Sequence, residues 1–329
     1  MSEQTKTVAV AGATGFIGRH VVGELLSRGY GVRALVRNTS KAAQVFRDVE
    51  GKDRLTPVQA ESVTAESSPR LVEGTIGCVN CIGIIREEHG QRFESLHVRV
   101  PDLLTHACKE HGASRFIQIS AFGADPDGRA EYQRTKHAGE GFVRRSGLAW
   151  TIFRPSLVVG TGGEMAELMA TWARGKSQPW FFMPYFTRKA DGNWDLIPGE
   201  TTDPVIAPIA VTDLARAVAD AMENDETIGE IYNAVGMETV SWPELLEFAR
   251  DNTLGAKPKI QPSGVPAPAA AFAATAAGMV GMGGLLPYDA GMASMGSEDS
   301  TASLDKFTKH FGFTPASFRG ALREAVHQL

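Results

Sequence analysis

The chain has 329 residues, of which 43% are hydrophobic and 22% charged, as in ordinary globular proteins. Its formal net charge of -5 argues against a nucleic-acid partner, because binding to nucleic acids needs a basic surface. The three cysteines form no disulfide framework, so we expect a reducing compartment. Cys78 and Cys81 lie three apart on a predicted strand and therefore on opposite faces, so we predict no metal site. A strand is predicted almost at the N-terminus, so we expect no signal peptide and a cytoplasmic location.

The segment 7–18, TVAVAGATGFIG, predicts a buried parallel strand, a glycine turn and the start of a helix. Gly12 would let the chain turn, Gly15 would let the backbone approach a pyrophosphate, and Gly18 would let the helix at 19–28 pack close to the strand. The N-terminus of that helix would offer free N–H groups to an anion. We therefore predict a dinucleotide site here; the alternative is a tight turn without a ligand.

The residue after the second predicted strand, 32–36, bears on the choice of cofactor. NAD sites usually have an acidic residue at this point, but no Asp or Glu occurs between Glu24 and Asp48. Arg37 stands there instead, and an arginine can pair with a 2′-phosphate through a charge-assisted fork of hydrogen bonds. We therefore favour NADP(H), with NAD(H) as the alternative. The alternative for Arg37 is an exposed, solvated side chain in a loop that binds no ligand.

The rest of the N-terminal half alternates buried strands with amphipathic helices, which predicts an α/β fold with a doubly wound parallel sheet. Ligands collect at the carboxyl ends of the strands in such sheets. Ser62 and Val63 follow the third strand, where the adenine would lie, and Gly83 would let the backbone after the fourth strand pass close to the cofactor. Strands are predicted at 55–59, 76–81, 115–119 and 150–153, and helices at 93–111 and 131–145.

Three polar residues near these strand ends form a candidate catalytic group. Ser120 ends the fifth strand, and Tyr132 and Lys136 share one face of the next helix because they lie four residues apart. A lysine ammonium beside a phenol would lower the pKa of the phenol. Together the three can polarise a carbonyl and pass a proton to or from it during hydride transfer. The alternative is an exposed pair on a surface helix.

The pattern divides the chain into two unequal parts. We assign residues 1–160 to the nucleotide-binding domain, with a return segment near 205–235, and residues 161–204 and 236–329 to a smaller lobe for substrate or partner. The apolar cluster WFFMPYF at 180–186 is predicted as a loop folded over the core; the alternatives are a pocket for a hydrophobic substrate and a contact surface for a partner or membrane. The uncharged run 267–287 predicts a small-residue helix, and one interpretation places it at a membrane interface.

The N-terminal half resembles the atypical short-chain dehydrogenase/reductase superfamily. The landmarks are GATGFIG at 12–18, Ser120, the Tyr132/Lys136 pair and RPS at 154–156. Within the superfamily, the chain is most similar to the NAD(P)-binding accessory subunit of respiratory complex I and its bacterial relatives. That similarity rests on NCIGIIRE at 80–87, SAFGAD at 120–125, YQRTK at 132–136 and FGFTP at 311–315.

The resemblance implies a Rossmann-like fold with a smaller, mainly helical C-terminal lobe and a tightly held NADPH. Relatives often have Gly-Asp where Glu61 and Ser62 stand, so the contact with the adenine differs here. The residues assigned to the cofactor are Gly12, Thr14, Gly15, Phe16, Ile17, Gly18, Arg37, Ser62, Val63, Cys81, Ile82, Gly83, Tyr132, Lys136 and Pro155.

Three functions fit these residues. The first is an NADPH-dependent reductase of a carbonyl or quinone-like hydrophobic compound, with Tyr132 as the acid, Lys136 as its tuner and Ser120 as the orienter of the carbonyl. The second is a structural nucleotide-binding assembly protein whose apolar segments, 180–186 and 267–287, contact a protein partner or, peripherally, the inner face of a membrane. The third is an NAD-dependent nucleotide-sugar epimerase or dehydratase. Its diphosphate would need basic residues from the smaller lobe, for which the candidates are Arg174, Lys176, Arg188 and Lys189.

Overall fold

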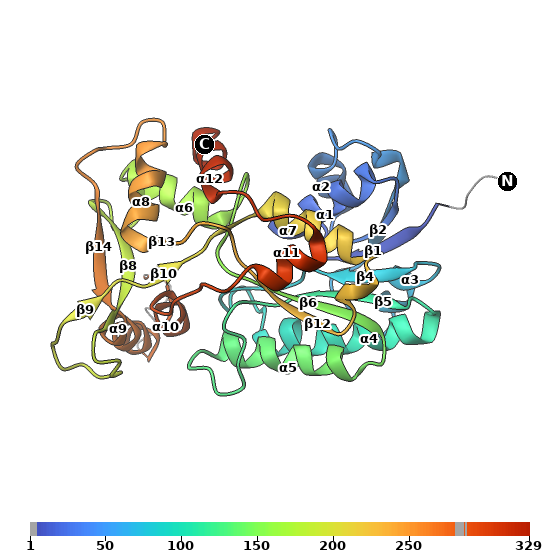
Figure 1. Ribbon diagram of the computed structural model, residues 1–329, viewed down its shortest axis with the longest axis horizontal. Helices are drawn as coiled ribbons and strands as arrows, with labels where there is room; N and C mark the ends of the chain where they lie inside the picture. Colours follow the sequence, from blue (N-terminus) through green and yellow to red (C-terminus); the bar gives the residue numbers. More distant parts are fainter. Residues whose placement is uncertain (1–4, 280–285, 287) are drawn as a thin grey trace.

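The computed structural model describes residues 5–279, 286 and 288–329, so part of the predicted helix at 267–287 lies outside the described residues. Its centre is a sheet of seven parallel strands in the order β12-β6-β5-β4-β1-β2-β3 (Figure 1). The order reverses between β1 and β4, as in doubly wound sheets, which confirms the predicted fold class. The strands are β1 (Thr7–Ala11), β2 (Gly31–Val36), β3 (Leu55–Gln59), β4 (Gly77–Asn80), β5 (Arg115–Ile119), β6 (Ala149–Pro155) and β12 (Glu230–Ala234).

Helices cover both faces of this sheet (Figure 1). One face packs against α1 (Phe16–Ser27), α2 (Thr39–Val45), α7 (Val211–Ala221) and α11 (Asp305–Phe311). The other packs against α3 (Ser67–Val72), α4 (Val100–His111) and α5 (Glu131–Arg145). Because both faces are covered, the central strands β1, β4 and β5 are buried at nearly every position, and β1 is the short apolar run that 7–18 predicted.

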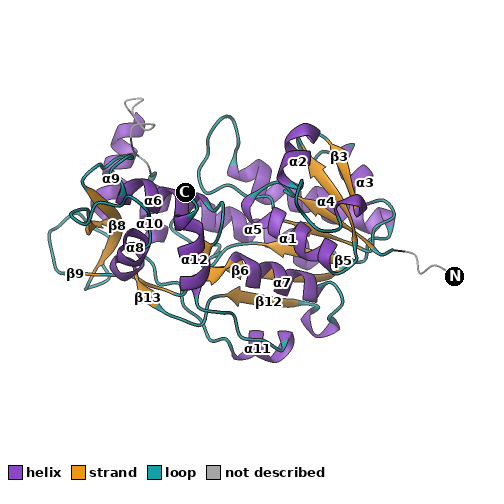
Figure 2. Cartoon of the chain, turned by 90° about the horizontal axis from the view of Figure 1, so that it is seen from above, coloured by secondary structure: helices purple, strands orange, loops and turns teal. Residues whose placement is uncertain are grey.

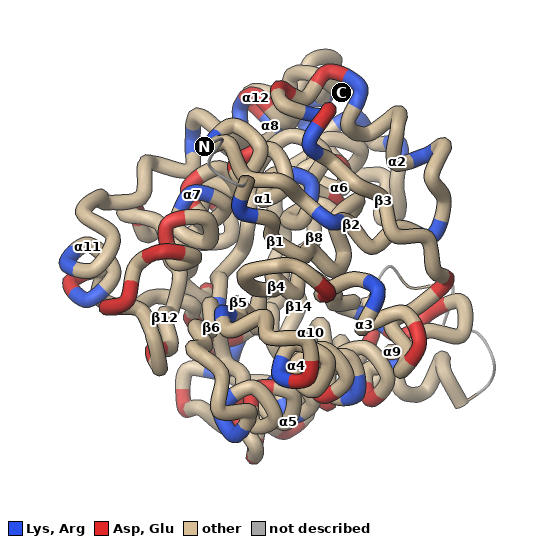
Figure 3. Tube along the Cα trace, turned by 90° about the vertical axis from the view of Figure 1, so that its right-hand side faces the viewer, with Lys and Arg blue, Asp and Glu red and all other residues tan. Residues whose placement is uncertain are grey.

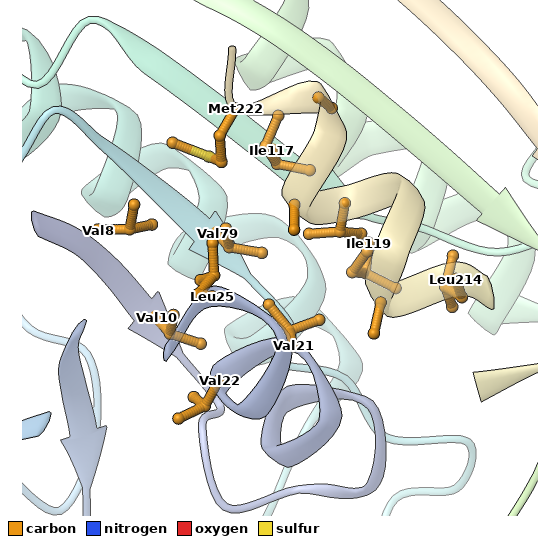
Figure 4. Packing of buried hydrophobic residues seen from close by; sticks show 14 of the residues in the cluster. Val8, Val10, Val21, Val22, Leu25, Val79, Ile117, Ile119, Leu214 and Met222 are labelled. Carbon is orange, nitrogen blue, oxygen red and sulfur yellow. The ribbon is translucent and has the colours of Figure 1, made fainter. Parts of the chain in front are cut away.

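The core shows how β1 serves both faces. Val8 and Val10 contact the cluster that contains Leu25 of α1 and Leu214 of α7 (Figure 4). Ala9 and Ala11 point the other way, into the cluster under α3 and α4. All four side chains are fully buried, so the strand that leads into the glycine turn is held from both sides.

The predicted helix at 93–111 forms two joined segments. A π-helical stretch, η2 (Glu94–Arg99), continues into α4, which begins at Val100. Pro101 therefore lies in the first turn of α4, where a missing N–H costs little, and it does not interrupt a regular helix. Gly112, with φ of +76°, ends α4.

The prediction of a loop at 180–186 is wrong. Phe182 begins β8 (Phe182–Lys189), which pairs in parallel with β14 (Gln261–Pro266) and antiparallel with β9 (Thr201–Thr202). The partner of β8 lies far along the chain, because Phe182 is opposite Gln261, so a local pattern carried no sign of this pairing. The smaller lobe is therefore built on a short sheet as well as on helices.

The smaller lobe lies beside the carboxyl ends of the large sheet (Figure 2). Its main core combines α6 (Glu164–Ala173), α8 (Trp242–Asp251) and α12 (Phe318–His327), while α9 (Ala267–Met279) and α10 (Ala290–Gly296) contact β8. Two short strand pairs join the lobe to the large sheet region: β7 (Val158–Val159) with β11 (Ile209–Ala210), and β10 (Val205–Ile206) with β13 (Val240–Ser241). Two 3-10 turns occupy Lys52–Arg54 and Asp225–Thr227.

The C-terminal residues contribute to both cores. Phe307 and Phe311 of α11 belong to the core beneath the large sheet, and Phe318 and Leu322 of α12 belong to the core of the lobe. Acidic and basic residues are interspersed around the outside of the molecule (Figure 3). In the part of the chain that the structure describes, no helix has the length and apolar character needed to cross a bilayer.

Candidate functional site

The glycine turn after β1 leaves a helix N-terminus open to a ligand. Gly12 has φ of +76°, and a Cβ there would lie 2.9 Å from the carbonyl carbon of Cys81. A Cβ on Gly18 would lie 2.0 Å from the carbonyl oxygen of Gly12, so α1 reaches this close to the turn only with glycine at 18. Gly15 is exposed and no side chain caps α1. These free N–H groups and the positive end of the helix dipole suit the diphosphate of a dinucleotide.

The other residues of the predicted phosphate loop are half-buried beside a second loop. Thr14, Phe16 and Ile17 are all partly exposed, and a Cβ on Gly163 would lie 2.9 Å from Cζ of Phe16. Arg19 of α1 donates a hydrogen bond of 2.5 Å to the carbonyl oxygen of Gly162. The loop at 160–163, which follows β7, is thereby fastened to the first helix of the nucleotide-binding domain.

Two arginines of β2 and its end have different roles. The guanidinium of Arg33 donates hydrogen bonds to the carbonyl oxygens of Arg70 and Glu73, so it fastens α3 to the sheet. Arg37 is exposed at the carboxyl end of β2, and its guanidinium makes no hydrogen bond or ion pair within the described residues. Of these two arginines, Arg37 is therefore the one whose guanidinium is free to bind a phosphate on the adenosine ribose.

The segment after β3 places the predicted adenine contacts in two environments. Val63 is 8% exposed and packs into the core under α3. Ser62 is exposed, and its carbonyl oxygen accepts a hydrogen bond from Oγ of Ser67 that helps to start α3. The side chain of Ser62 thus remains directed to solvent, as an adenine contact would require.

The turn after β4 brings the chain close to Lys136. Oδ1 of Asn80 accepts a hydrogen bond of 3.1 Å from the N–H of Ile82, which fixes the path of Cys81 and Ile82. A Cβ on Gly83 would lie 2.7 Å from Nζ of Lys136. Glycine at 83 is therefore what allows the lysine of α5 to reach the end of β4, where the cofactor is expected to pass.

Tyr132 and Lys136 meet on α5, with Nζ of Lys136 5.7 Å from the centroid of the Tyr132 ring. Burial raises the pKa of Tyr132 to about 12 and lowers that of Lys136 to about 8. The pKa of the phenol is thus raised where the sequence predicted that the lysine would lower it, because burial disfavours the charged phenolate. Tyr132 keeps its proton at neutral pH, which makes it a proton donor.

Ser120 is bound to a carboxylate that the sequence analysis missed. Its Oγ donates a hydrogen bond of 2.6 Å to Oε1 of Glu140, whose side chain is fully buried. Arg154 completes the group with hydrogen bonds of 2.8 and 2.7 Å to the two oxygens of Glu140. The hydroxyl proton of Ser120 is thus used in a hydrogen bond inside the protein, and this bond connects the end of β5 to α5. Only the position of Glu140, one helical turn after Lys136, could have suggested it.

His97 is a second residue that the sequence analysis missed. Its Nε2 accepts a hydrogen bond of 3.2 Å from the N–H of Ile84, and its Nδ1 lies 3.0 Å from Oγ1 of Thr135. Nε2 is an acceptor, so the ring proton sits on Nδ1 and is donated to Thr135. Burial lowers the pKa of His97 to about 2, so the ring is neutral. His97 joins the turn after β4 to α5 beside Tyr132. The helical pattern of apolar residues around position 97 did not indicate this role.

Two cavities meet at Tyr132. A cavity of about 340 Å³ lies between the two parts of the molecule, with an apolar wall that includes Pro155 at the end of β6. An open groove of about 1260 Å³ lies beside it, under α9 and the loop at 85–89. Both have Ile85 and Tyr132 in their walls. The phenol therefore faces a space of the size and polarity of a small-molecule site.

The cluster at 180–186 divides between this cavity and the surface. Tyr185 and Phe186 of β8 line the cavity. Trp180 and Phe181, which precede β8, are 55% and 71% exposed. The alternative of a pocket-lining segment thus describes the second half of the cluster, while the first half remains an exposed apolar patch.

The basic residues that a sugar diphosphate would need are largely engaged elsewhere. Arg174 donates to the carbonyl oxygen of Leu254 at 2.8 Å, and Arg188 and Lys189 form ion pairs. Their partners are Asp299 at 2.7 Å and Asp195 at 2.6 Å. Among the residues described, no group of three or more His, Cys, Asp or Glu is placed to hold a metal ion.

Comparison with known proteins agrees with this geometry. Residues 12–171 match the model of a family described as NAD(P)H-binding. The chain is 28% identical over 244 residues to the Arabidopsis thaliana protein NADH dehydrogenase (ubiquinone) 1 alpha subcomplex subunit 9, mitochondrial. That match covers 74% of this chain but only 56% of the relative, so the chain corresponds to little more than half of that relative's length.

Two further matches are named as a reductase and an oxidoreductase. Ceramide reductase from Caulobacter vibrioides is 31% identical over 155 residues, which is 47% of each chain. The structure of an NADPH-dependent quinone oxidoreductase from Escherichia coli, complexed with NADPH, superposes with a TM-score of 0.65 at 20% identity. It covers 96% of this chain and 98% of its own, and at this identity the likeness is one of fold. Residues 12–171 thus match the NAD(P)H-binding family model, in a chain that is similar in sequence to the complex I subunit and in fold to the NADPH-dependent quinone oxidoreductase.

Proposed function

We propose that the protein is an NADP(H)-dependent reductase of a hydrophobic carbonyl or quinone-like compound. The observation that carries this proposal is the position of Tyr132, which is protonated and lies in the wall of an apolar cavity. Lys136 stands beside it, close to the turn at Gly83 where the cofactor is expected to pass. A phenol between a nucleotide site and an apolar cavity is the arrangement that carbonyl reduction needs.

The nucleotide would be held by residues at five strand ends and on α5. Gly12, Gly15 and Gly18 would bind the diphosphate, and the exposed Arg37 would bind the 2′-phosphate, which favours NADP(H) over NAD(H). The remaining contacts would come from Thr14, Phe16, Ile17, Ser62, Val63, Cys81, Ile82, Gly83, Tyr132, Lys136 and Pro155. When bound, the reduced nicotinamide supplies a hydride.

The residues around the cavity would then complete the reduction. Tyr132 gives its proton to the carbonyl oxygen as negative charge develops on that atom. The ammonium of Lys136 stabilises the resulting phenolate by its charge. The proton on Tyr132 is replaced from solvent through the open groove. The hydroxyl proton of Ser120 is used in the hydrogen bond to Glu140. Ser120 therefore holds the end of β5 in place, and toward a substrate its oxygen could act only as a hydrogen-bond acceptor.

The experiment is to denature the gently purified protein, identify the released nucleotide, and then follow NADPH absorbance with hydrophobic ketones and quinones. Released NADP(H) and substrate-dependent oxidation are expected. Released NAD(H) would contradict the assignment of Arg37. Nucleotide without turnover on any carbonyl or quinone would contradict the reductase and favour the second function below.

A second candidate is a structural nucleotide-binding accessory protein of the complex I type. The similarity to the Arabidopsis thaliana subunit over 74% of this chain favours it, as does the exposed patch at Trp180 and Phe181. In that case the nucleotide stabilises the fold, and its removal should lower the melting temperature without affecting any reaction. A cytoplasmic location, with peripheral contact to a membrane protein or surface, remains part of this proposal.

A further inference from the structure

The apolar cavity beside Tyr132 contains one carboxylate whose second oxygen is unused. Glu298 follows α10 and lies in the cavity wall. Its Oε2 accepts a hydrogen bond of 2.8 Å from Nε2 of Gln133. Its Oε1 accepts no hydrogen bond from any residue that the structure describes. Glu298 is partly exposed in the cavity wall, so this oxygen is open to a hydrogen-bond donor on a ligand in the cavity.

The position of Glu298 is fixed from the α5 side. Oε1 of Gln133 accepts a hydrogen bond of 3.0 Å from the N–H of Ala130, so the amide of Gln133 is held at both ends. Gly123 leaves the space for this arrangement, since a Cβ there would lie 3.2 Å from Nε2 of Gln133 and 3.7 Å from Oε2 of Glu298. The carboxylate is thus bound to the residue that follows Tyr132 on α5, and it lies in the wall of the same cavity as Tyr132.

The neighbouring carboxylate shows the contrast. Oδ1 of Asp299 accepts a hydrogen bond of 2.8 Å from the N–H of Val205, and Oδ2 pairs with Arg188 at 2.7 Å. No Lys or Arg among the described residues forms an ion pair with Glu298. Burial raises the pKa of Glu298 above its ordinary value, with Arg129 and Asp125 acting on it in opposite directions. Both oxygens of Asp299 thus have partners in the protein, whereas Oε1 of Glu298 has none among the described residues and remains open to the cavity.

We propose that Glu298 is the specificity-determining residue of this cavity, which takes an elongated apolar molecule carrying a hydrogen-bond donor, an amide N–H or a hydroxyl, near its carbonyl. This rests on the proposed function and narrows its substrate class. The aliphatic and aromatic wall holds the apolar body, Tyr132 reaches the carbonyl, and Oε1 of Glu298 accepts the donor. A simple quinone offers only acceptors and is a poor match for a carboxylate oxygen.

The test compares two ligands that differ in one donor. Binding of N-decylacetamide and of N-decyl-N-methylacetamide to the full chain is measured at about pH 8, where the carboxylate is ionised, through quenching of the fluorescence of Trp172 and Trp242 in the cavity wall. The wild-type protein should bind the N–H compound about tenfold more tightly or better, as expected for a hydrogen bond to a charged group. Equal affinities, or a preference for the N-methyl compound, would overturn the proposal without any variant being made.

Two variants then assign the selectivity to Glu298. Glu298→Gln can keep its hydrogen bond with Gln133 while losing the charged acceptor, so the ratio of the two affinities should fall about tenfold. Asp299→Asn changes the adjacent carboxylate and should leave the ratio unchanged. A ratio that survives in Glu298→Gln would overturn the assignment.

The outcome is separable from that of the reductase assay, because ligand binding needs no turnover. Donor-dependent binding without reduction of any carbonyl would remove the reductase and leave the selectivity of the cavity standing. Reduction of carbonyls without any preference for a hydrogen-bond donor would contradict the role of Glu298 and leave the reductase standing.

Discussion

Oγ of Ser120 lies 2.6 Å from Oε1 of Glu140, and the serine hydroxyl donates its hydrogen bond to a carboxylate that solvent does not reach. Arg154 binds the same carboxylate from the other side. A serine in this state holds the ends of β5 and β6 together against α5, and it has no proton to offer a substrate. Its removal should therefore affect stability more than turnover.

Ser120→Ala should lower the free energy of unfolding by about 1.5–3 kcal/mol, the usual value for a hydrogen bond to a charged group, and reduce kcat by less than about tenfold. Urea denaturation and NADPH oxidation measure the two effects. Unchanged stability together with a loss of kcat as large as that of Tyr132→Phe would mean that Ser120 orients the substrate instead.

Tyr132→Phe removes the proposed proton donor and leaves the ring that packs beside His97. The expected result is a fall in kcat of about 100-fold or more, the usual contribution of a general acid. The affinity for NADPH should change little, because the phenol is one of many proposed contacts with the nucleotide. Tyr30→Phe is the control, because Tyr30 is buried at the start of β2, away from the cavity. Parent-like turnover in Tyr132→Phe would remove this residue from the mechanism.

Arg37→Glu should weaken NADPH far more than NADH, because the new carboxylate repels the 2′-phosphate that only NADPH carries. The two dissociation constants are measured by fluorescence of the bound dihydronicotinamide. Arg47→Glu makes the same change of charge at another exposed position and should affect both nucleotides equally. Equal losses in Arg37→Glu would show that this arginine does not recognise the phosphate.

Lys136, with a pKa of about 8, should set the alkaline limit of activity. If its ammonium stabilises the phenolate, kcat/KM falls as pH rises through about 8. The effect on stability has the opposite sign. The lysine has the higher pKa in the unfolded chain, so between about pH 8 and 10.5 the unfolded chain binds more protons than the folded one. The contribution of Lys136 to the free energy of unfolding therefore increases as pH rises through this range. A pH profile of kcat/KM that stays flat to about pH 10 would contradict the role of Lys136.

The parts of the fold that follow from local pattern were predictable. The bounds of β3, β5 and α5 agree with the predicted segments at 55–59, 115–119 and 131–145. Buried parallel strands are short apolar runs, and the helices between them carry one apolar face, so both patterns are visible in the sequence. The doubly wound order follows from their alternation and from the right-handed crossovers that connect parallel strands.

What was missed depends on contacts between distant segments. The pairing of Phe182 with Gln261 needs both strands to be known, and neither predicts the other. Glu140 and His97 acquire their roles only when β6 and the turn after β4 fold against α5. The pKa of Tyr132 depends on how deeply the phenol is buried, which spacing from Lys136 does not reveal.

The C-terminal residues have a consequence for how the molecule unfolds. Phe307 and Phe311 fill the core under the large sheet, and a few residues later Phe318 and Leu322 fill the core of the smaller lobe. Neither core is complete without this last stretch of chain. Truncation after residue 300 would open both cores at once, and the intact chain should melt in a single cooperative transition, with no separately stable half for a protease to release.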